Sequence, residues 1–307
     1  MEQTRTRRYE PKRKKRRKVL KILLFLLLVA VGYGGYQFYA GMQLAKDSKI
    51  EKEDFSGDVA EGGVTNYLVL GVDSRGEEKS RTDTMMLVSW NRDTDKLKLV
   101  SFMRDIYAEI PNHKNYKLNT AYYLGGVQLA KDTISSMFDV PIHHYALIDF
   151  KNFESLIDIV APNGVEIDVE KDMSENIYVS LKKGQQTLNG KELLGYARFR
   201  MDGEGDFGRV RRQQQVMEAL KDQVFSVKSV PQLPKLIGAT QGYITTDISS
   251  TEQLSTVLRV ATSGIDVEKL TIPEQGMYVD NTYSGVGDVL EINRDKTVQS
   301  LHQFLEK

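Results

Sequence analysis

The longest apolar stretch of the chain runs from Val19 to Ala40 and is interrupted by Lys21 and Gln37. At 1.5 Å per residue, a helix of about 22 residues reaches roughly 30 Å, which is the thickness of the hydrocarbon core of a bilayer. Lys21 lies near one end, where its ammonium group can reach the interface, and several Tyr and Phe residues gather at the other end. The pattern therefore predicts one transmembrane helix over residues 19–40.

Shorter apolar runs follow residue 62 and predict a folded domain. Strands are expected at residues 67–72, 84–90, 97–102, 145–150 and 164–169, and helices at 118–138, 153–160, 251–262 and 295–306. Residues 185–228 are expected to be mainly helical around one glycine-rich loop. Strands and helices alternate without strict βαβ regularity, so we expect an α/β fold with a central mixed sheet covered by helices on both faces. Residues 231–307 carry no motif and are expected to complete this sheet and its helices.

Charge is segregated along the chain, although the formal net charge is zero. Residues 1–21 hold 11 of the 42 Lys and Arg residues beside two acidic residues, which leaves 31 basic and 40 acidic residues in the rest. By the positive-inside rule the basic tail stays in the cytoplasm and the acidic remainder lies outside. We therefore expect a cytoplasmic tail at 1–18, the transmembrane helix at 19–40, a polar extracytoplasmic stalk at 41–62 and a globular domain at 63–307. A cleaved signal peptide is the alternative, with Gly35 and Ala40 as small residues near a cleavage point.

Charged residues stand directly at the ends of several predicted strands. Asp73 and Arg75 follow the first strand, Arg81 and Asp83 precede the second, and Arg104 with Asp105 follows the third. Ligands of open α/β sheets bind at strand ends, and two carboxylates brought together there suit a hard cation such as Mg²⁺. The alternative is a set of solvated loops with surface ion pairs.

The helix predicted to begin near Phe207 places polar residues on its apolar face. Val216, Leu220 and Val224 form its apolar stripe, and Arg209 and Gln213 fall on the same stripe nearer the N-terminus. Burying an unpaired charge is costly, and a bound anion at the helix N-terminus would remove that cost. The alternative is a buried ion pair with Asp202, Glu204 or Asp206. Several arginines converging on one place suggest phosphate, because the guanidinium group matches phosphate oxygens with two parallel hydrogen bonds.

Seven segments in this order resemble motifs of the LytR-CpsA-Psr family of Gram-positive cell-envelope proteins. The resemblance covers roughly residues 63–230 together with the anchor. Met103 stands where the family often has proline, which affects only local backbone stiffness. The segments are Leu70-Gly-Val-Asp-Ser-Arg75, Arg81-Thr-Asp-Thr-Met-Met86, Ser101-Phe-Met-Arg-Asp105, Lys117-Leu-Asn-Thr-Ala121, Gly184-Gln-Gln-Thr-Leu-Asn-Gly190, Tyr196-Ala-Arg-Phe-Arg200 and Asp206-Phe-Gly-Arg-Val-Arg-Arg-Gln213.

The resemblance implies a three-layer α/β/α sandwich and a phosphotransferase of the Gram-positive cell membrane. The implied reaction moves an anionic wall glycopolymer, of teichoic acid or capsule type, from an undecaprenyl-pyrophosphate carrier onto peptidoglycan. Asp73, Asp83 and Arg104 would be catalytic, and the two aspartates would hold Mg²⁺ or Mn²⁺ against the pyrophosphate. Asp73, Asp105 and Asp206 are the candidate general bases for the acceptor hydroxyl. The implied pyrophosphate-binding residues are Arg75, Arg81, Arg198, Arg200, Arg209 and Gln213.

Three other functions compete with this transferase. A polyprenyl-pyrophosphate pyrophosphatase would use water as the acceptor and share every phosphate ligand. A non-catalytic lipid-glycan receptor with a regulatory role would keep the arginines but would not need the metal pair. A DNA-binding regulator would need a folded module, and a tail of about 18 residues is too short for one; topology and anionic lipids already explain its charge. No nucleic acid partner is therefore expected.

Overall fold

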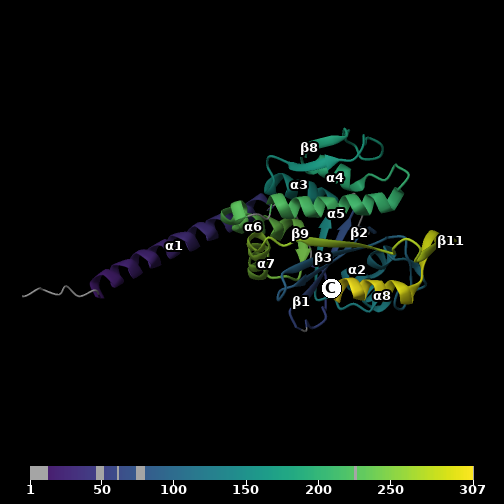
Figure 1. Cartoon of the computed structure of the whole chain (residues 1–307), viewed down its shortest axis with the longest axis horizontal. Helices are drawn as coiled ribbons and strands as arrows, with labels where there is room; N and C mark the ends of the chain where they lie inside the picture. The colour runs from purple at the N-terminus through teal and green to yellow at the C-terminus, as the bar shows by residue number, and fades with distance from the viewer. Residues whose placement is uncertain (1–12, 46–51, 61, 74–79, 225–226, 307) are drawn as a thin grey trace, which may run out of the picture.

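The computed structural model describes residues 13–45, 52–60, 62–73, 80–224 and 227–306 of the chain. A long helix, α1 (Arg13–Leu44), extends from one side of a layered domain (Figure 1). Within α1, residues 18–44 form the one helix of the described residues that is long and apolar enough to cross a membrane. Side chains such as Leu24, Phe25 and Leu28 are exposed, as expected for a surface that meets lipid. The predicted anchor is therefore helical, and the helix extends past residue 40 into the segment expected to be a stalk.

A mixed six-stranded sheet forms the centre of the domain, in the order β10-β3-β2-β1-β6-β9. β1 is parallel to β6 and antiparallel to β2, β3 is parallel to β10 and antiparallel to β2, and β9 is antiparallel to β6. This register places the carboxyl ends of β1, β3, β6 and β10 and the start of β2 at one edge of the sheet. The strands are β1 (Val64–Val72), β2 (Thr82–Asn91), β3 (Lys96–Phe102), β6 (His144–Asp149), β9 (Ile244–Thr246) and β10 (Val267–Ile272).

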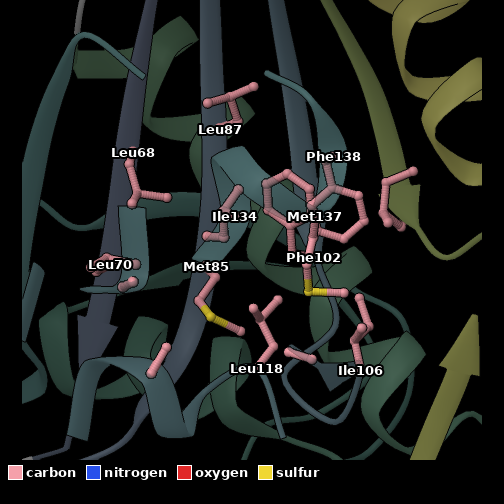
Figure 2. Packing of buried hydrophobic residues seen from close by; sticks show 14 of the residues in the cluster. Leu68, Leu70, Met85, Leu87, Phe102, Ile106, Leu118, Ile134, Met137 and Phe138 are labelled. Atoms are coloured by element: carbon pink, nitrogen blue, oxygen red, sulfur yellow. The ribbon is translucent and has the colours of Figure 1, made fainter. Parts of the chain in front are cut away.

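Helices cover both faces of the sheet, as the sequence predicts. One face packs against α2 (Thr120–Phe138) and α8 (Arg294–Glu306), and the other packs against α3 (Phe150–Val160) and α5 (Gly205–Val224) (Figure 1). Alternate residues of the strands, including Leu68 and Leu87, meet Ile134 and Phe138 of α2 in the main core (Figure 2). Phe102 and Phe138 stack with ring centroids 4.8 Å apart. The α/β/α sandwich is thus built from strands that bury both of their faces.

A second, smaller core lies over α3 and α5. It contains the hairpin of β7 (Val165–Val169) and β8 (Gly184–Leu188), together with α4 (Gly190–Arg198). Asn189 and Glu192 form a reciprocal capping box that fixes the start of α4. The sequence expectation that 185–228 is mainly helical is correct for α4 and α5 and wrong for residues 185–188, which form β8. Residues 185–188 have no polar–apolar alternation of their own, and their pairing with the alternating strand β7 outweighs the helical tendency of Gln.

The C-terminal third completes the sheet, as expected, and adds a hairpin that the sequence did not predict. After α5 come a short 3-10 helix (Val227–Gln232), α6 (Leu233–Tyr243), β9, α7 (Ser250–Ser263) and β10. The hairpin consists of β11 (Tyr278–Tyr283) and β12 (Gly287–Ile292), and it lies at the end of the domain opposite α1 (Figure 1).

The anchor helix packs against the domain through α6. A Cβ atom at Gly41 would overlap the carbonyl oxygen of Lys235, and one at Gly238 would overlap the carbonyl oxygen of Phe38. Glycine at these positions lets the two helix backbones approach closely. The hydroxyl of Tyr243 donates to the carbonyl oxygen of Leu44 at 3.0 Å. The predicted anchor helix therefore packs directly against the folded domain.

The segment between the anchor and β1 also contacts the domain. Glu53 accepts hydrogen bonds from the hydroxyl of Tyr122 at 2.8 Å and from the backbone N–H of Val127 at 2.7 Å. Asp58 accepts from Lys131 and from the backbone N–H of Ile142, both at 2.7 Å. These residues belong to the part of the chain expected to be a stalk, and they lie along α2 and the start of β6.

Candidate functional site

The sheet edge described above brings the predicted charged residues together. Asp73 follows β1, Asp83 is the second residue of β2, and Arg104 lies two residues after the end of β3. The antiparallel register pairs Val72 with Thr82 and Ser101 with Met86, so all three charged residues emerge at the same edge. The sequence expectation that strand ends collect these side chains is therefore confirmed.

The N-terminus of α5 adds the remaining charges. Asp202 accepts from the backbone N–H groups of Glu204 and Gly205 at 3.2 and 3.1 Å, and Gly205 takes a positive φ of 54° to begin the helix. The first turns then carry Asp206 and Arg209 to the sheet edge. Arg209 and Gln213 are 4% and 7% exposed, which agrees with the inward direction that the helical spacing predicts.

Arg104 lies at the centre of the cluster. Its guanidinium donates to Asp83 at 2.6 Å, to Asp206 at 2.8 Å and to Asp105 at 3.3 Å. Arg209 contacts Asp206 at 3.2 Å and Asp83 at 3.8 Å. The ion pair between Arg209 and Asp206, which the sequence analysis left as an alternative to a bound anion, is therefore present in the structure. Asp83 and Asp206 each contact both Arg104 and Arg209 and so hold the two guanidinium groups side by side.

The electrostatics of the two arginines differ. Burial lowers the pKa of Arg104, but the charges of Asp206, Asp83 and Asp105 outweigh it and hold the pKa above its usual value. The pKa of Arg209 is lowered, first by burial and then by the charge of Arg104, and its carboxylate partners compensate only in part. The Nε of Arg209 is buried and has no hydrogen-bond partner among the described residues. An anionic ligand beside Arg209 would raise its pKa and would accept a hydrogen bond from its Nε.

Asp105 extends the cluster toward the β3 side of the site. Its carboxylate accepts from Lys117 Nζ at 2.7 Å as well as from Arg104. Burial raises the pKa of Asp105, but the hydrogen bond from Lys117 and the charge of Arg104 outweigh it, so the net pKa lies below the usual value. Lys117 belongs to a motif of the family resemblance, and we did not assign it a role from sequence.

Asp73 marks the opposite side of the site. It accepts from Arg198 at the end of α4 at 3.0 Å, and the Arg198 guanidinium lies 4.9 Å from the ring centroid of Phe150. Phe150 begins α3 directly after β6, which neighbours β1. The sheet order thus places Asp105, Arg104, Asp83, Asp73 and Arg198 in a row along the edge.

The remaining predicted residues are placed less centrally. Arg200 is half exposed and lies 3.9 Å from Asp206, at the margin of the cluster. Arg81 is exposed and lies over the ring of Tyr123 at 5.9 Å from its centroid. Arg75 lies outside the described residues.

Sequence reasoning did not anticipate a second charged network beside the site. Arg212 is fully buried and contacts Asp202 at 3.1 Å, Glu170 at 3.4 Å and the carbonyl oxygen of Phe199 at 2.7 Å. This network ties α5 to the loop that precedes it and holds the α5 N-terminus in place. The signal in the sequence is the helical spacing, because Arg212 lies three residues after Arg209 in the predicted helix and so falls near the same inward face.

The charge balance of the cluster bears on a metal ion. Four aspartates, Asp73, Asp83, Asp105 and Asp206, lie among five cationic side chains, which are Arg104, Arg198, Arg200, Arg209 and Lys117. A surplus of one positive charge is small for a ligand with the charge of pyrophosphate. No group of three or more acidic or histidine side chains in the described part of the chain is arranged to hold a metal. Oxygen donors from one or two aspartates fit Mg²⁺, which keeps waters and takes its other ligands from phosphates.

Comparisons with known proteins agree with the motifs. A sequence model of the LytR_cpsA_psr family matches residues 35–300. The chain is 44% identical over 280 residues to "Regulatory protein MsrR" of Staphylococcus aureus (strain COL), covering 90% of this chain and 86% of that protein. It is 30% identical over 310 residues to the polyisoprenyl-teichoic acid–peptidoglycan teichoic acid transferase TagV of Bacillus subtilis (strain 168), covering 91% of this chain and 76% of TagV.

Two solved structures share the fold. The crystal structure of B. subtilis TagV superposes with a TM-score of 0.69 at 25% identity, covering 80% of this chain and 97% of that one. The family protein YwtF (TagT) with bound octaprenyl pyrophosphate lipid superposes with a TM-score of 0.59 at 24% identity, covering 84% and 94%. At that identity, the second likeness shows the fold alone.

Proposed function

This chain belongs to the LytR-CpsA-Psr family, and from that premise we propose that it is a glycopolymer–peptidoglycan phosphotransferase. Its donor would be an anionic wall glycopolymer, of teichoic acid or capsule type, on undecaprenyl pyrophosphate, and its acceptor would be peptidoglycan. The observation that carries this proposal is the row of arginines and aspartates at one sheet edge, closed by the N-terminus of α5. The relationship to TagV, named as a teichoic acid transferase, supports the same reaction.

Arg104 and Arg209 would bind the donor pyrophosphate between them. Both guanidinium groups contact Asp83 and Asp206, so they are held close together before a ligand arrives. Arg198 would contact the pyrophosphate from the Asp73 side and Arg200 from the α5 side. Gln213, which lies behind Arg209, would donate a hydrogen bond from its neutral amide. Fixed cationic groups stabilise the charge that develops on phosphoryl oxygens in the transition state.

Asp73 and Asp83 would hold Mg²⁺ or Mn²⁺ at the β1–β2 end of the row. When bound, a divalent ion supplies positive charge that a cluster with a surplus of only one cation lacks, and it polarises the phosphoryl oxygens. The fit to this chain rests on donor chemistry, since both groups are carboxylates at adjoining strand ends. Arg104 and Arg198 donate hydrogen bonds to these carboxylates and so orient them.

The transfer itself exchanges the phosphoanhydride bond of the donor for a new phosphoester bond to the acceptor. The oxygen of an acceptor hydroxyl forms a bond to the phosphorus that carries the glycopolymer, and the bond from that phosphorus to the bridging oxygen breaks. Undecaprenyl phosphate leaves, and the hydroxyl proton passes to a carboxylate. Asp73, Asp105 and Asp206 remain the candidate bases, and all three accept hydrogen bonds from cationic groups. The pKa of Asp105 is lowered, which keeps this carboxylate deprotonated and weakens it as a base.

The anchor supports a site on the outer side of the membrane. The basic tail stays in the cytoplasm by the positive-inside rule, which places the domain on the outer surface of a Gram-positive cell membrane. Energy for transfer is already present in the pyrophosphate bond of the donor, so the reaction needs no nucleotide outside the cell.

A second candidate is a lipid-glycan receptor that regulates without transferring. The carboxylates hold the arginine guanidinium groups in place, so the cluster could bind an anion even if no acceptor reacted with it. MsrR, which is 44% identical to this chain, is named as a regulatory protein. The two functions share the pyrophosphate ligands and differ in whether a product forms.

A product assay with the full-length protein in detergent micelles tests the proposal. The protein is incubated with Mg²⁺, a short prenyl-pyrophosphoryl glycan and peptidoglycan oligomers, and the products are identified by mass spectrometry. We expect a glycan–phosphate–peptidoglycan adduct from the wild type and its loss in Arg104→Ala and Arg209→Ala. Arg259→Ala is the matched control, because Arg259 is exposed and pairs with Asp95 beside Trp90.

Each other outcome identifies a different function. Release of glycan phosphate without an adduct would indicate a pyrophosphatase. Donor binding without any product, with an acceptor shown to be competent by another transferase, would indicate the receptor. Equal adduct formation by wild type and both arginine variants would contradict the assignment of the cluster as the donor site.

A further inference from the structure

The row of charges leaves its two ends in different surroundings. At the β6 end, Arg198 lies over Phe150 and holds Asp73. At the β3 end, Asp105 and the next residue, Ile106, contact the hairpin of β11 and β12. The backbone N–H of Leu290 in β12 donates to the carbonyl oxygen of Asp105 at 2.8 Å, and Ile106 forms a bridge with Leu290. The hairpin is thus attached to the site at the residue next to Arg104.

Two stacked aromatic pairs join the hairpin to the site. Tyr107, in the short strand β4 (Tyr107–Ala108), stacks on Tyr283 with ring centroids 4.5 Å apart and ring planes 17° apart. Phe207, the neighbour of Asp206, stacks on Tyr278 with centroids 5.5 Å apart and planes 25° apart. All four rings are partly exposed. β4 pairs with β5 (Tyr116–Lys117), which sets Tyr107 beside the lysine that binds Asp105.

Strand alternation places Asn281, Tyr283 and Glu291 on one face of the hairpin. Tyr278, Thr282 and Asp288 lie on the other face. Both faces carry polar and acidic groups. Asn281 donates to Glu291 at 2.9 Å, Thr282 donates to Asp288 at 2.8 Å, and the hydroxyl of Tyr283 contacts Glu291 at 3.2 Å. Residues 278–292 contain three acidic residues and no Lys or Arg. This surface therefore repels an anionic polymer, whereas the adjoining row of arginines attracts one.

Partly exposed aromatic rings beside hydrogen-bonding carboxylate and amide groups match the chemistry of a sugar. The C–H face of a pyranose ring packs on an aromatic face, and its hydroxyl and acetamido groups bond to polar side chains. A neutral sugar tolerates the acidic hairpin, and the charged donor does not. Tyr107 also pairs with Lys117, which donates to Asp105, so a sugar bound at this stack would adjoin the cluster.

We propose that the Tyr283 face of the hairpin of β11 and β12, together with Tyr107, is a glycan-binding subsite that holds uncharged N-acetylated sugars of the acceptor strand. The inference rests on the proposed transferase and assigns the acceptor to the β3 end of the row and the donor to its centre. Asp105 and Asp206, rather than Asp73, then face the acceptor hydroxyl.

Two measurements on the full-length protein in detergent micelles test this subsite. The first is the acceptor KM in the transfer assay, with the donor KM measured in parallel. The second is binding of an N-acetylglucosamine tetrasaccharide, followed by saturation-transfer NMR without any donor. Tyr107→Leu and Tyr283→Leu remove the stack and keep an apolar side chain. Tyr283→Phe keeps the stack and removes only the hydroxyl, and Tyr178→Leu is the control because Tyr178 is 75% exposed on a loop outside the hairpin.

We expect each Leu variant to raise the acceptor KM about tenfold, the change that a loss of about 1.4 kcal/mol produces, with the donor KM unchanged. Tetrasaccharide binding should weaken in parallel, and Tyr283→Phe and Tyr178→Leu should behave as wild type. Thermal unfolding curves confirm that each variant is folded. If one Leu variant is not folded, the other repeats the test, because each of them removes the same stack.

The readouts separate this inference from the proposed function. Acceptor KM values and tetrasaccharide binding that are equal in wild type and Leu variants would overturn the subsite, whatever the transfer activity. Tetrasaccharide binding that depends on Tyr107 and Tyr283, in a protein that forms no adduct, would uphold the subsite and remove the transferase. A wild type that does not bind the tetrasaccharide and has no measurable acceptor saturation would also overturn the subsite.

Discussion

Replacing Asp206 by asparagine should lower stability and raise affinity for a phosphate ligand. In the wild type the Asp206 carboxylate lies 2.8 Å from Arg104 and 3.2 Å from Arg209. The neutral amide of Asp206→Asn has nearly the same shape but leaves both guanidinium groups with one less negative charge. Arg209 is affected most, because its side chain is only 5% exposed.

The size of the effect follows from burial. Breaking a fully buried ion pair costs about 3–5 kcal/mol, and breaking an exposed one costs about 0–1 kcal/mol. Asp206 is 17% exposed and Arg104 is 19% exposed, and Arg104 keeps Asp83 at 2.6 Å. We therefore expect a loss of about 2 kcal/mol, which lowers Tm by roughly 4–8 °C in a domain of this size.

Thermal unfolding of the full-length protein in detergent, with and without pyrophosphate and without divalent ions, measures both effects. Asp206→Asn raises the surplus of the cluster from one positive charge to two, so pyrophosphate should raise the Tm of the variant more than that of the wild type. Asp172→Asn is the matched control, since Asp172 is 61% exposed in a surface pair with Lys182. A Tm for Asp206→Asn equal to that of the control, with the same response to pyrophosphate as wild type, would refute the reasoning.

Three further predictions concern the metal pair, the core and pH. The Asp73→Ala, Asp83→Ala double variant should lose Mg²⁺-dependent adduct formation in the mass-spectrometric assay; retained activity would contradict the metal assignment. Leu87→Ala removes a fully buried side chain of the sheet and should cost about 2–5 kcal/mol in denaturant unfolding, and a loss below about 1 kcal/mol would contradict the packing. The pKa of Asp105 is lowered on folding, so its contribution is present above the unfolded value of about 4 and is lost as pH falls through the lower folded value. The stability difference between wild type and Asp105→Asn should therefore be present at neutral pH and should shrink below about pH 4, as unfolding at a series of pH values will show.

The sequence predicted the site better than its surroundings. Apolar runs ending in charged residues located β1, β2 and β3, and the helical spacing predicted that Arg209 and Gln213 point inward. These signals are local, because each depends on residues a few positions apart. The contact of the β11–β12 hairpin with Asp105 joins Leu290 to a residue 185 positions earlier, which no short pattern encodes.

Partner choice inside the cluster was also beyond the sequence. Asp202, Glu204 and Asp206 were equivalent candidates for Arg209, and the structure assigns Asp206 to Arg209 and Asp202 to Arg212. The choice follows from where α5 begins, since Asp206 and Arg209 are three residues apart within the helix and share a face, whereas Asp202 and Glu204 precede the helix. Strand β8 was missed for a related reason, because only its pairing with β7 distinguishes it from a helical segment.

The close contact between α1 and α6 sets how far the site stands from the membrane. α6 follows the C-terminal end of α5, and the charged cluster lies at the N-terminal end of that helix, 20 residues away. A helix of that length measures about 30 Å, so the length of α5 sets the separation between the cluster at its N-terminal end and α6, which contacts the anchor. With glycine-packed helices at the junction, that distance cannot vary by hinge motion there. Under the proposed function, a lipid-linked donor would have to reach that fixed height, and the acceptors would come from the same layer of the wall.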